Sequence, residues 1–204
     1  MEKIDFKREM KEFYRPPRKP VIVDVPPLQF VMINGKGYPG TSQEYQDAMQ
    51  TLFPVAYTLR FAIKKAGLLD YKIMPLEGLW WAEDMDVFTV DDRPEEWLWT
   101  SMIMQPSQVT KDLFAKAVQT AKEKKNPVAL SKIRLETYHE GLSVQVMHTG
   151  PFSEEGPVIE NMHQFAFDQG YELRGKHHEI YLSDFTRTAP EKLKTVIRQP
   201  ISES

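Results

Sequence analysis

Residues 177–184 hold the side chains best suited to chemistry, in the order His-His-Glu-Ile-Tyr-Leu-Ser-Asp. In a β-strand, successive side chains alternate between two faces. Ile180 and Leu182 then share an apolar face. The opposite face carries an imidazole, a carboxyl, a phenol and a hydroxyl group, from His177, Glu179, Tyr181 and Ser183. A half-buried strand with a solvated outer face shows the same alternation, so the pattern alone does not define a site.

The aromatic content of the chain favours a functional role for Glu179. The sequence contains 4 tryptophans, 8 tyrosines and 11 phenylalanines. A carboxyl group among aromatic rings has its pKa raised by desolvation and can donate a proton. The same group in its ionised form can orient a water molecule or attract an organic cation. We therefore predict that Glu179 lies in an aromatic cleft, with Tyr181 or Tyr138 as a nearby hydrogen-bond donor.

The tryptophans are candidate walls of this cleft. Trp80 and Trp81 are adjacent, so in a regular strand they cannot both point into one core. Trp97 and Trp99 share a face of the next predicted strand. Because large exposed aromatic side chains often mark binding sites, we expect at least one tryptophan at a surface or groove. The candidate ligand-binding residues are Trp80, Trp81, Trp97, Trp99, Tyr38 and His177.

Other arrangements for chemistry are weak. The five histidines lack a metal-ligand spacing, and His177 and His178 point to opposite faces of a regular strand. His148 is expected to be structural. The glycine-rich stretch 35–40 lacks the Walker spacing, and Ser183 lacks the context of a nucleophilic serine. We expect neither a metal ion nor a cofactor.

Composition excludes several classes of protein. The 204 residues are 41% hydrophobic and 27% charged, as in soluble globular proteins. A net charge of −3 argues against nucleic-acid binding, and the 0 cysteines exclude disulfides and thiolate chemistry. The N-terminus lacks a signal-peptide core, and no stretch approaches the roughly 18 apolar residues of a membrane span. We expect a cytoplasmic monomer or homodimer.

The elements follow each other in a repeated order. Residues 1–27 form an N-terminal arm, too short for a helix-turn-helix domain, with a short edge strand expected at 21–23. The first repeat spans about 28–106. It begins with a strand at 28–34 and a helix with a capping box at Thr41–Glu44. Two strands follow, at 71–81 and 95–105, joined by an acidic loop at 83–92. A connector helix spans about 107–126. The second repeat spans about 127–201. It begins with a hairpin at 132–138 and 142–149, continues with a helix from about 153 and the Glu179 strand, and ends with a last helix from Thr188 to about Arg198.

These patterns predict an α+β fold over residues 28–204. Strand–helix–strand–strand occurs twice, each time with a Gly/Pro break before the helix, at Gly37–Pro39 and at Gly150–Phe152. We expect two repeats related by a pseudo-twofold, with antiparallel sheets, helices on one side and a central ligand cleft. The tryptophan face of one repeat and the Glu179 face of the other would line its walls.

The chain resembles the GyrI-like small-molecule-binding domains, above all their stand-alone branch. The resemblance covers roughly residues 28–201. It rests on the twin strand–helix–strand–strand pattern, the His-Thr-Gly-Pro-Phe break at 148–152, and His-His-Glu-Ile-Tyr-Leu-Ser-Asp at 177–184, followed by the segment 188–200. By this resemblance Glu179 matches the family's cleft glutamate.

The resemblance implies a small hydrophobic or planar aromatic ligand and leaves two classes of function open. In part of the stand-alone branch, the cyclopropanoid cyclopropyl hydrolases, water opens the cyclopropane of DNA-alkylating toxins. In multidrug-sensing transcription regulators, related domains capture organic cations. Regulation through a partner such as gyrase is a third implication. The chain lacks the regulators' DNA-binding domain, so we expect no direct nucleic-acid binding.

Overall fold

The computed structural model describes residues 2–83 and 93–203 and has an α+β fold built on antiparallel strands. The chain divides into two compact units. The first unit consists of Met1–Phe6, Leu28–Met74 and Trp80–Tyr138, and the second of Lys7–Pro27, Pro75–Leu79 and His139–Ser204. The predicted acidic loop lies, from residue 84 on, outside the described residues. No helix in the described ranges is long and apolar enough to cross a membrane.

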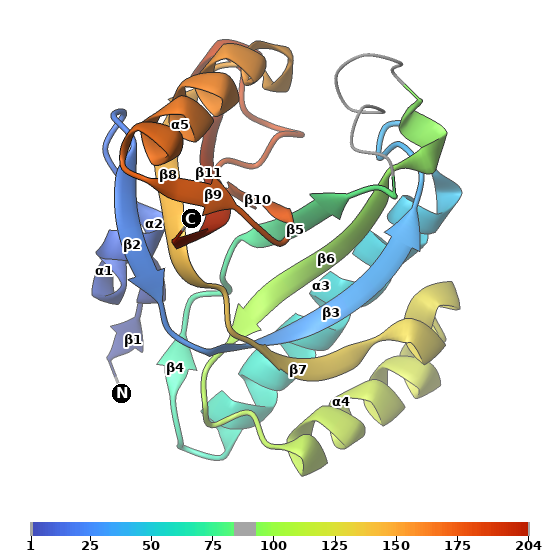
Figure 1. Cartoon of the computed structure of the whole chain (residues 1–204). Helices are drawn as coiled ribbons and strands as arrows, with labels where there is room; N and C mark the ends of the chain where they lie inside the picture. The colour runs from blue at the N-terminus through green and yellow to red at the C-terminus, as the bar shows by residue number, and fades with distance from the viewer. Residues whose placement is uncertain (1, 84–92, 204) are drawn as a thin grey trace. The chain divides into compact units, whose positions relative to one another are not determined.

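In the first unit a long helix packs on antiparallel strands. Strand β3 lies between β6 and β7, with Met32 opposite Met102 on one side and Arg134 on the other. Helix α3 packs against β3 and β6, and α4 packs against α3 (Figure 1). A short parallel pair, β1 and β4, completes this unit. The elements are β1 (Lys3–Ile4), β3 (Leu28–Lys36), α3 (Gln43–Lys65), β4 (Asp70–Tyr71), η2 (Pro94–Glu96), β6 (Leu98–Gln105), α4 (Lys111–Lys124), η3 (Val128–Lys132) and β7 (Arg134–Tyr138).

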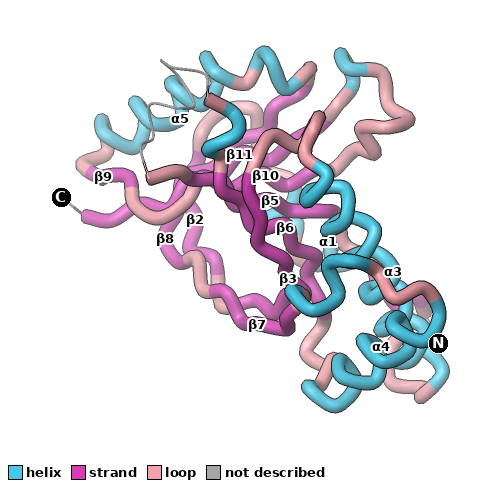
Figure 2. Tube along the Cα trace, turned by 90° about the vertical axis from the view of Figure 1, so that its right-hand side faces the viewer, coloured by secondary structure: helices cyan, strands magenta, loops and turns pink. Residues whose placement is uncertain are grey.

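The second unit has the strand order β2-β8-β11-β10-β5, and β9 pairs with the end of β11. Strands β8, β10 and β11 run side by side in Figure 2. Helix α5 packs against β8 and β9. The elements are α1 (Phe6–Glu9), α2 (Lys11–Tyr14), β2 (Val21–Val25), β5 (Leu76–Trp81, whose last two residues belong to the first unit), β8 (Gly141–Thr149), η4 (Phe152–Glu154), α5 (Gly156–Asp168), β9 (Tyr171–Leu173), β10 (His177–Tyr181), η5 (Pro190–Lys192) and β11 (Lys194–Glu203).

Apolar periodicity explains most of these elements. Helix α3 buries the face that the sequence predicts, with Leu52, Leu59 and Ile63 fully buried, and it continues through Pro54. Its N-cap is Ser42 and not the predicted Thr41, because Ser42 Oγ accepts the Tyr45 N–H. The core of the second unit consists of Val144, Val146, Met162, Ala166, Ile197 and Ile201.

Two predicted elements are wrong, the last helix at 188–198 and the hairpin at 132–149. Residues 194–203 form strand β11 and not a helix, because β11 is hydrogen-bonded on both sides, to β8 and β10. Its β-branched Thr195, Val196 and Ile197 favour a strand, and Pro200 opposes a helix interior. The expected hairpin is not formed either, since β7 pairs with β3 while β8 pairs with β11 and β2.

The new strand changes the correspondence that the predicted repeats would have. After β8 the chain forms α5, β9, β10 and β11, and after β3 it forms α3, β4, β5 and β6. If the two series correspond, as the prediction of two repeats requires, the Glu179 strand β10 matches β5, which ends in Trp80 and Trp81, and not β6, which carries Trp99.

Gly35 makes room for a buried indole in the first unit. Gly35 of β3 lies opposite Trp99 of β6, and a Cβ atom at position 35 would overlap atoms of the Trp99 ring. Trp99 cannot move away easily, because it is fully buried, packs edge-on against Tyr45 with ring centroids 5.1 Å apart, and donates Nε1–H to Gly37 O at 3.1 Å.

We expect Gly35→Ala to lower the free energy of unfolding by about 1–3 kcal/mol, as overpacking does. Chemical denaturation followed by circular dichroism measures this change. Gly156→Ala is the matched control, since its Cβ would meet nothing within 4 Å. A Gly35→Ala protein as stable as the wild type would contradict the close packing against Trp99.

Candidate functional site

Strand β10 of the second unit presents Glu179 on its partly exposed face. In register with β11, Glu179 lies opposite Ile197. His178 and Ile180 are buried on the other face, with 1% and 0% of their surface exposed, whereas the Glu179 side chain is 16% exposed. The predicted alternation of β10, with the two histidines on opposite faces, is confirmed.

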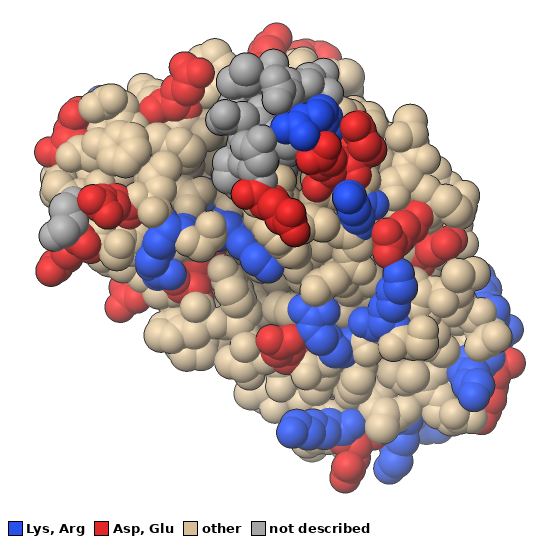
Figure 3. All heavy atoms as spheres, turned by 45° about the vertical axis from the view of Figure 1, so that its right-hand side comes forward, with Lys and Arg blue, Asp and Glu red and all other residues tan. Residues whose placement is uncertain are grey.

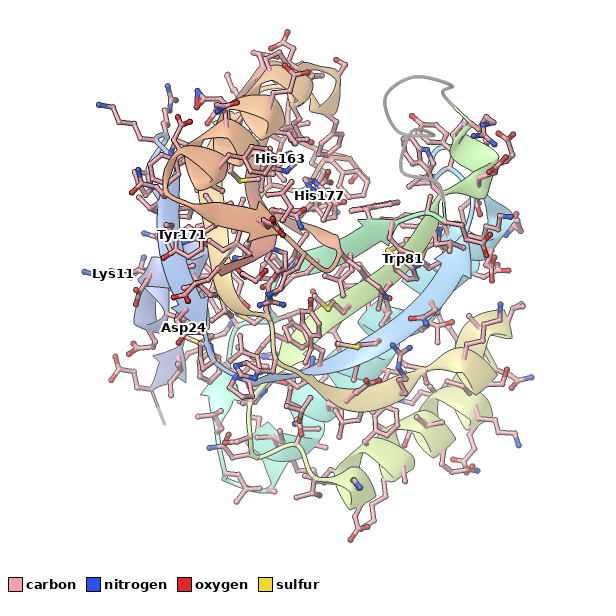
Figure 4. The ribbon with its side chains drawn as sticks, viewed as in Figure 1. Lys11, Asp24, Trp81, His163, Tyr171 and His177 are labelled. Atoms are coloured by element: carbon pink, nitrogen blue, oxygen red, sulfur yellow. The ribbon has the colours of Figure 1, made fainter. Side chains whose placement is uncertain are left out.

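Two neighbours on the same face hold the Glu179 carboxyl group. The Tyr181 hydroxyl donates to Oε2 at 2.7 Å, and His177 Nε2 lies 3.3 Å from Oε1. His163 of α5 lies beside His177 (Figure 4). Burial, followed by the electrostatic effect of His177, lowers the pKa of His163 to about 4. His163 is thus neutral near pH 7, and its buried Nε2 has no hydrogen-bond partner among the described residues.

A second carboxyl group, Glu155, interacts with Glu179. Glu155 precedes α5 and is only 4% exposed. Its carboxyl group interacts with Thr195 of β11 and with Glu179. Burial, together with the charge of Glu179, raises the pKa of Glu155 to about 9. The N-terminus of α5 favours an ionised Glu155, but helix-terminus effects are typically only about 0.3–1 kcal/mol at exposed sites.

The direction of the Glu179 pKa differs from the one predicted. Burial alone would raise the pKa of Glu179, but hydrogen bonds from His177, Tyr181 and Glu155 and the charge of His177 outweigh it and lower the pKa. Two adjacent carboxyl groups cannot both ionise easily, so one keeps a proton. Among the described residues, Thr195 alone lowers the pKa of Glu155, whereas His177, Tyr181 and Glu155 together lower that of Glu179. At neutral pH Glu179 is therefore the carboxylate.

Three aromatic rings gather beside Tyr181. The ring centroids of Phe152 and Tyr181 are 5.8 Å apart, those of Tyr181 and Phe185 6.3 Å, and those of Phe152 and Phe185 6.4 Å, all in edge-to-face contact. Phe152 and Phe185 are 42% and 44% exposed. Exposed rings next to a carboxylate offer both stacking surface and attraction for a cation.

The sequence analysis missed Phe152, Phe185 and Glu155 as site residues. Phe152 belongs to the Gly-Pro-Phe break and Phe185 follows the motif at 177–184, so both lay inside segments that the analysis had singled out. Their proximity to Tyr181 depends on how η4 and the segment after β10 fold back. Nothing in the sequence marks Glu155, which sits in an ordinary polar stretch.

The predicted tryptophans lie in the first unit and differ in exposure. Trp99 is a core residue with 0% exposure, which corrects its prediction as a ligand contact, because Gly35 and Tyr45 enclose its ring. Trp97 contacts Tyr38 and Trp80 edge-on, with centroid distances of 5.6 and 6.2 Å.

The more accessible predicted residues of the first unit are Tyr38, Trp81 and Trp97. Trp80 is only 7% exposed, Trp81 and Trp97 are half-buried, and Tyr38 is 45% exposed. Tyr38 lines an open hollow of about 440 Å³, whose other lining residues are Gly37, Thr41, Ser42, Pro94 and Glu95. Tyr138 ends β7, opposite Leu28 of β3. Ligand contacts for Tyr38, Trp80, Trp81 and Trp97, and a catalytic role for Tyr138, stay predictions.

The buried face of β10 carries a chain of ionic hydrogen bonds within the second unit. His178 lies between two carboxyl groups, with Nε2 3.0 Å from Glu77 Oε2 and Nδ1 2.9 Å from Glu140 Oε1. Tyr14 donates to Glu77 at 2.8 Å, and Arg198 donates to Glu140 at 2.9 Å. At most 2% of the surface of each of these residues is exposed.

Charge balance explains why these ionic hydrogen bonds are stable in the interior. Burial would lower the pKa of His178, but Glu140 and Glu77 raise it to about 9. Burial would raise the pKa of Glu140, but His178 and Arg198 lower it to about 2. At neutral pH the carboxylate of Glu140 thus faces two cations, His178 and Arg198, and buried charges are tolerated in the interior only when they are paired in this way. Glu140, predicted to lie in a hairpin turn, is therefore a buried structural ion.

Over residues 2–83 and 93–203, metal ligands do not cluster into a further site. In the part of the chain that the structure describes, no group of three or more His, Asp or Glu residues could hold a metal ion. His148 Nε2 lies 3.2 Å from Pro151 O, which confirms its structural role. On the face drawn in Figure 3, basic and acidic side chains are interspersed.

Comparisons with known proteins identify the class. Residues 18–202 match the family described as the GyrI-like small molecule binding domain, and the chain belongs to this family of small-molecule-binding proteins. A search of curated proteins by sequence found no match.

Three solved structures from Listeria innocua are similar over 98% of this chain and 100% of theirs. The first is an uncharacterized conserved protein with 44% identity and a TM-score of 0.91. The other two are described as hydrolases, with 43% identity and a TM-score of 0.89, and with 41% identity and a TM-score of 0.86. The α+β fold is thus shared with proteins of the same length.

Proposed function

We propose that this protein is a hydrolase that adds water to the cyclopropane ring of cyclopropanoid DNA-alkylating toxins. The observation that carries the proposal is the Glu179 carboxyl group, held by Tyr181 and His177 beside the exposed rings of Phe152 and Phe185. The description of two structures with 41% and 43% identity as hydrolases supports the reaction class. The resemblance of the motif at 177–184 to the cyclopropyl hydrolases supports the substrate.

The reaction is an addition of one water molecule. The water oxygen bonds to a ring carbon, a C–C bond of the cyclopropane breaks, and its electron pair passes into the conjugated carbonyl, whose oxygen takes up a proton. The Glu179 carboxylate orients the water and accepts its proton. Such a general base typically contributes 10²–10⁴-fold.

The phenol of Tyr181 has a different role from the one first expected. A phenol has one proton to donate, and Tyr181 already donates it to Glu179 at 2.7 Å. Tyr181 therefore stabilises the carboxylate and is not free to donate to the developing oxyanion at the same time. Glu179 can pass the proton that it takes from the water on to the carbonyl oxygen, and aromatic stacking on Phe152 and Phe185 holds a planar substrate.

The test is incubation of the protein with a cyclopropane-containing alkylator, followed by mass spectrometry. We expect the mass of one water to be added to the compound, and the product to lose its ability to alkylate DNA. Recovery of unchanged alkylator at protein concentrations above that of the compound would contradict the proposal.

A second function, capture of lipophilic cations without chemistry, is favoured by the same ionised carboxylate beside three rings. It predicts saturable binding of organic cations with no chemical change. Quenching of tryptophan fluorescence by these cations also tests the predicted contacts of Trp80, Trp81 and Trp97. Regulation through a partner protein likewise leaves the ligand unchanged, so the water adduct separates the hydrolase from both alternatives.

A further inference from the structure

Glu155 is a buried carboxyl group that the proposed reaction does not use. It is 4% exposed, and its Oε1 accepts no hydrogen bond from the described residues. An ionised carboxyl group in this position would leave a buried acceptor unsatisfied, which costs free energy. A protonated one can donate to Glu179, because the two carboxyl groups interact with each other. The burial of Glu155 and its unpartnered Oε1 thus favour the protonated form of this carboxyl group.

The groups around the pair indicate which carboxyl group carries that proton. From β10, His177 and Tyr181 both contact Glu179. From β11, the neutral Thr195 hydrogen-bonds Glu155. His163 of α5 interacts with His177. Among the described residues, the one potential cation that acts on either carboxyl group is therefore His177, on the Glu179 side, and this favours the negative charge on Glu179.

We propose that Glu155 stays protonated at neutral pH and donates a hydrogen bond to the Glu179 carboxylate, acting as a positioning residue. The inference rests on the proposed function of Glu179, because it describes how the chain sets the charge of that site. The pair then presents one negative charge, which suits a neutral substrate or a single cation. Deprotonation of Glu155 adds a second negative charge to the same place.

A measurement without ligand tests the protonation itself. In protein labelled with ¹³C at the glutamate carboxyl carbons, we expect one resonance to titrate near pH 9, in line with the raised pKa of Glu155 of about 9. The resonance should be absent in Glu155→Gln. A Glu155 carboxyl group already ionised at pH 7 would overturn the inference, whatever the protein binds or hydrolyses.

Function is tested with Glu155→Gln and Glu155→Ala. The glutamine side chain can donate to Glu179 and accept from Thr195, as the protonated acid does. At pH 7 we expect Glu155→Gln to change the turnover of the alkylator by less than about threefold, since one hydrogen bond replaces another. The affinity for ethidium, a permanent planar cation, should change by no more than the same factor. Glu155→Ala should lower both the turnover and the affinity for ethidium by about 10-fold or more, because it removes a hydrogen bond to a charged group.

The pH profile separates a positioning role from a merely structural one. In the wild type, ethidium should bind at least about fivefold more tightly above pH 9, because the ionised Glu155 then attracts the cation. This factor corresponds to the Coulomb interaction of two opposite unit charges about 4 Å apart in water. Glu155→Gln should show no such step. Circular dichroism at each pH controls for unfolding, because His178 also has a pKa of about 9.

The outcomes distinguish the two proposals. A step that persists in Glu155→Gln, or a large loss of function in a folded Glu155→Gln protein at pH 7, would overturn the role of Glu155. Failure to add water to the alkylator, with the titration near pH 9 intact, would overturn the proposed hydrolysis alone.

Discussion

Glu179→Gln should lower turnover of a cyclopropanoid alkylator by about 10²–10³-fold, the effect of losing one acid–base or electrostatic group. Glutamine keeps the size of the side chain and the acceptor for Tyr181, but it cannot take a proton from water. Because Glu179 is 16% exposed and lies outside the buried ionic chain, the fold should persist. Mass spectrometry of the water adduct measures turnover, and circular dichroism measures folding.

Glu172→Gln is the matched control for this variant. It makes the same chemical change on β9, where the side chain is exposed, and should leave turnover unchanged. The lowered pKa of Glu179 adds a second expectation: turnover that needs the carboxylate should stay constant as pH falls to about the usual value of 4.5 and be lost only below it. A folded Glu179→Gln protein with wild-type turnover would rule out Glu179 as the catalytic base.

Glu140→Gln should reduce the free energy of unfolding by about 3–5 kcal/mol, as removal of one partner of a buried ion pair does. Glu140 is 2% exposed and pairs with both His178 and Arg198 at 2.9 Å. Without its charge, His178 and Arg198 both lose the carboxylate that pairs with them. Urea denaturation followed by circular dichroism measures the loss.

Glu172→Gln again serves as the control and should change stability by less than about 0.5 kcal/mol, as exposed substitutions do. Equal stability of Glu140→Gln and the wild type would mean that the buried ionic chain contributes nothing to the fold.

The same buried ionic residues predict how the free energy of unfolding depends on pH. The pKa of His178 is raised from 6.5 to about 9, so its contribution is fully present below pH 6.5 and is lost as pH rises through 9. The pKa of Glu140 is lowered from 4.5 to about 2, so its contribution is present above pH 4.5 and is lost as pH falls through 2. Stability from these two groups should therefore be greatest between pH 4.5 and 6.5, and Glu140→Gln should flatten the acid side of this profile.

The sequence by itself determined the features that depend on local periodicity. The α+β class, the stripe of α3, the edge strand β2 and the two faces of β10 follow from alternation and from 3.6-residue spacing, which a single segment carries within itself. Recognition of the motif at 177–184 also led to the GyrI-like family, whose match covers residues 18–202.

Tertiary structure decided which strands pair and which charges are buried. Residues 194–203 have helical capping signals before them, yet two flanking strands offer hydrogen bonds on both sides, and pairing outweighs local propensity. The buried state of Glu140 and the proton on Glu155 depend on partners 38 and 24 residues further along the chain, His178 and Glu179. Electrostatic environments of this kind arise only when distant segments fold together, and for that reason the direction of the Glu179 pKa could not be read from the sequence.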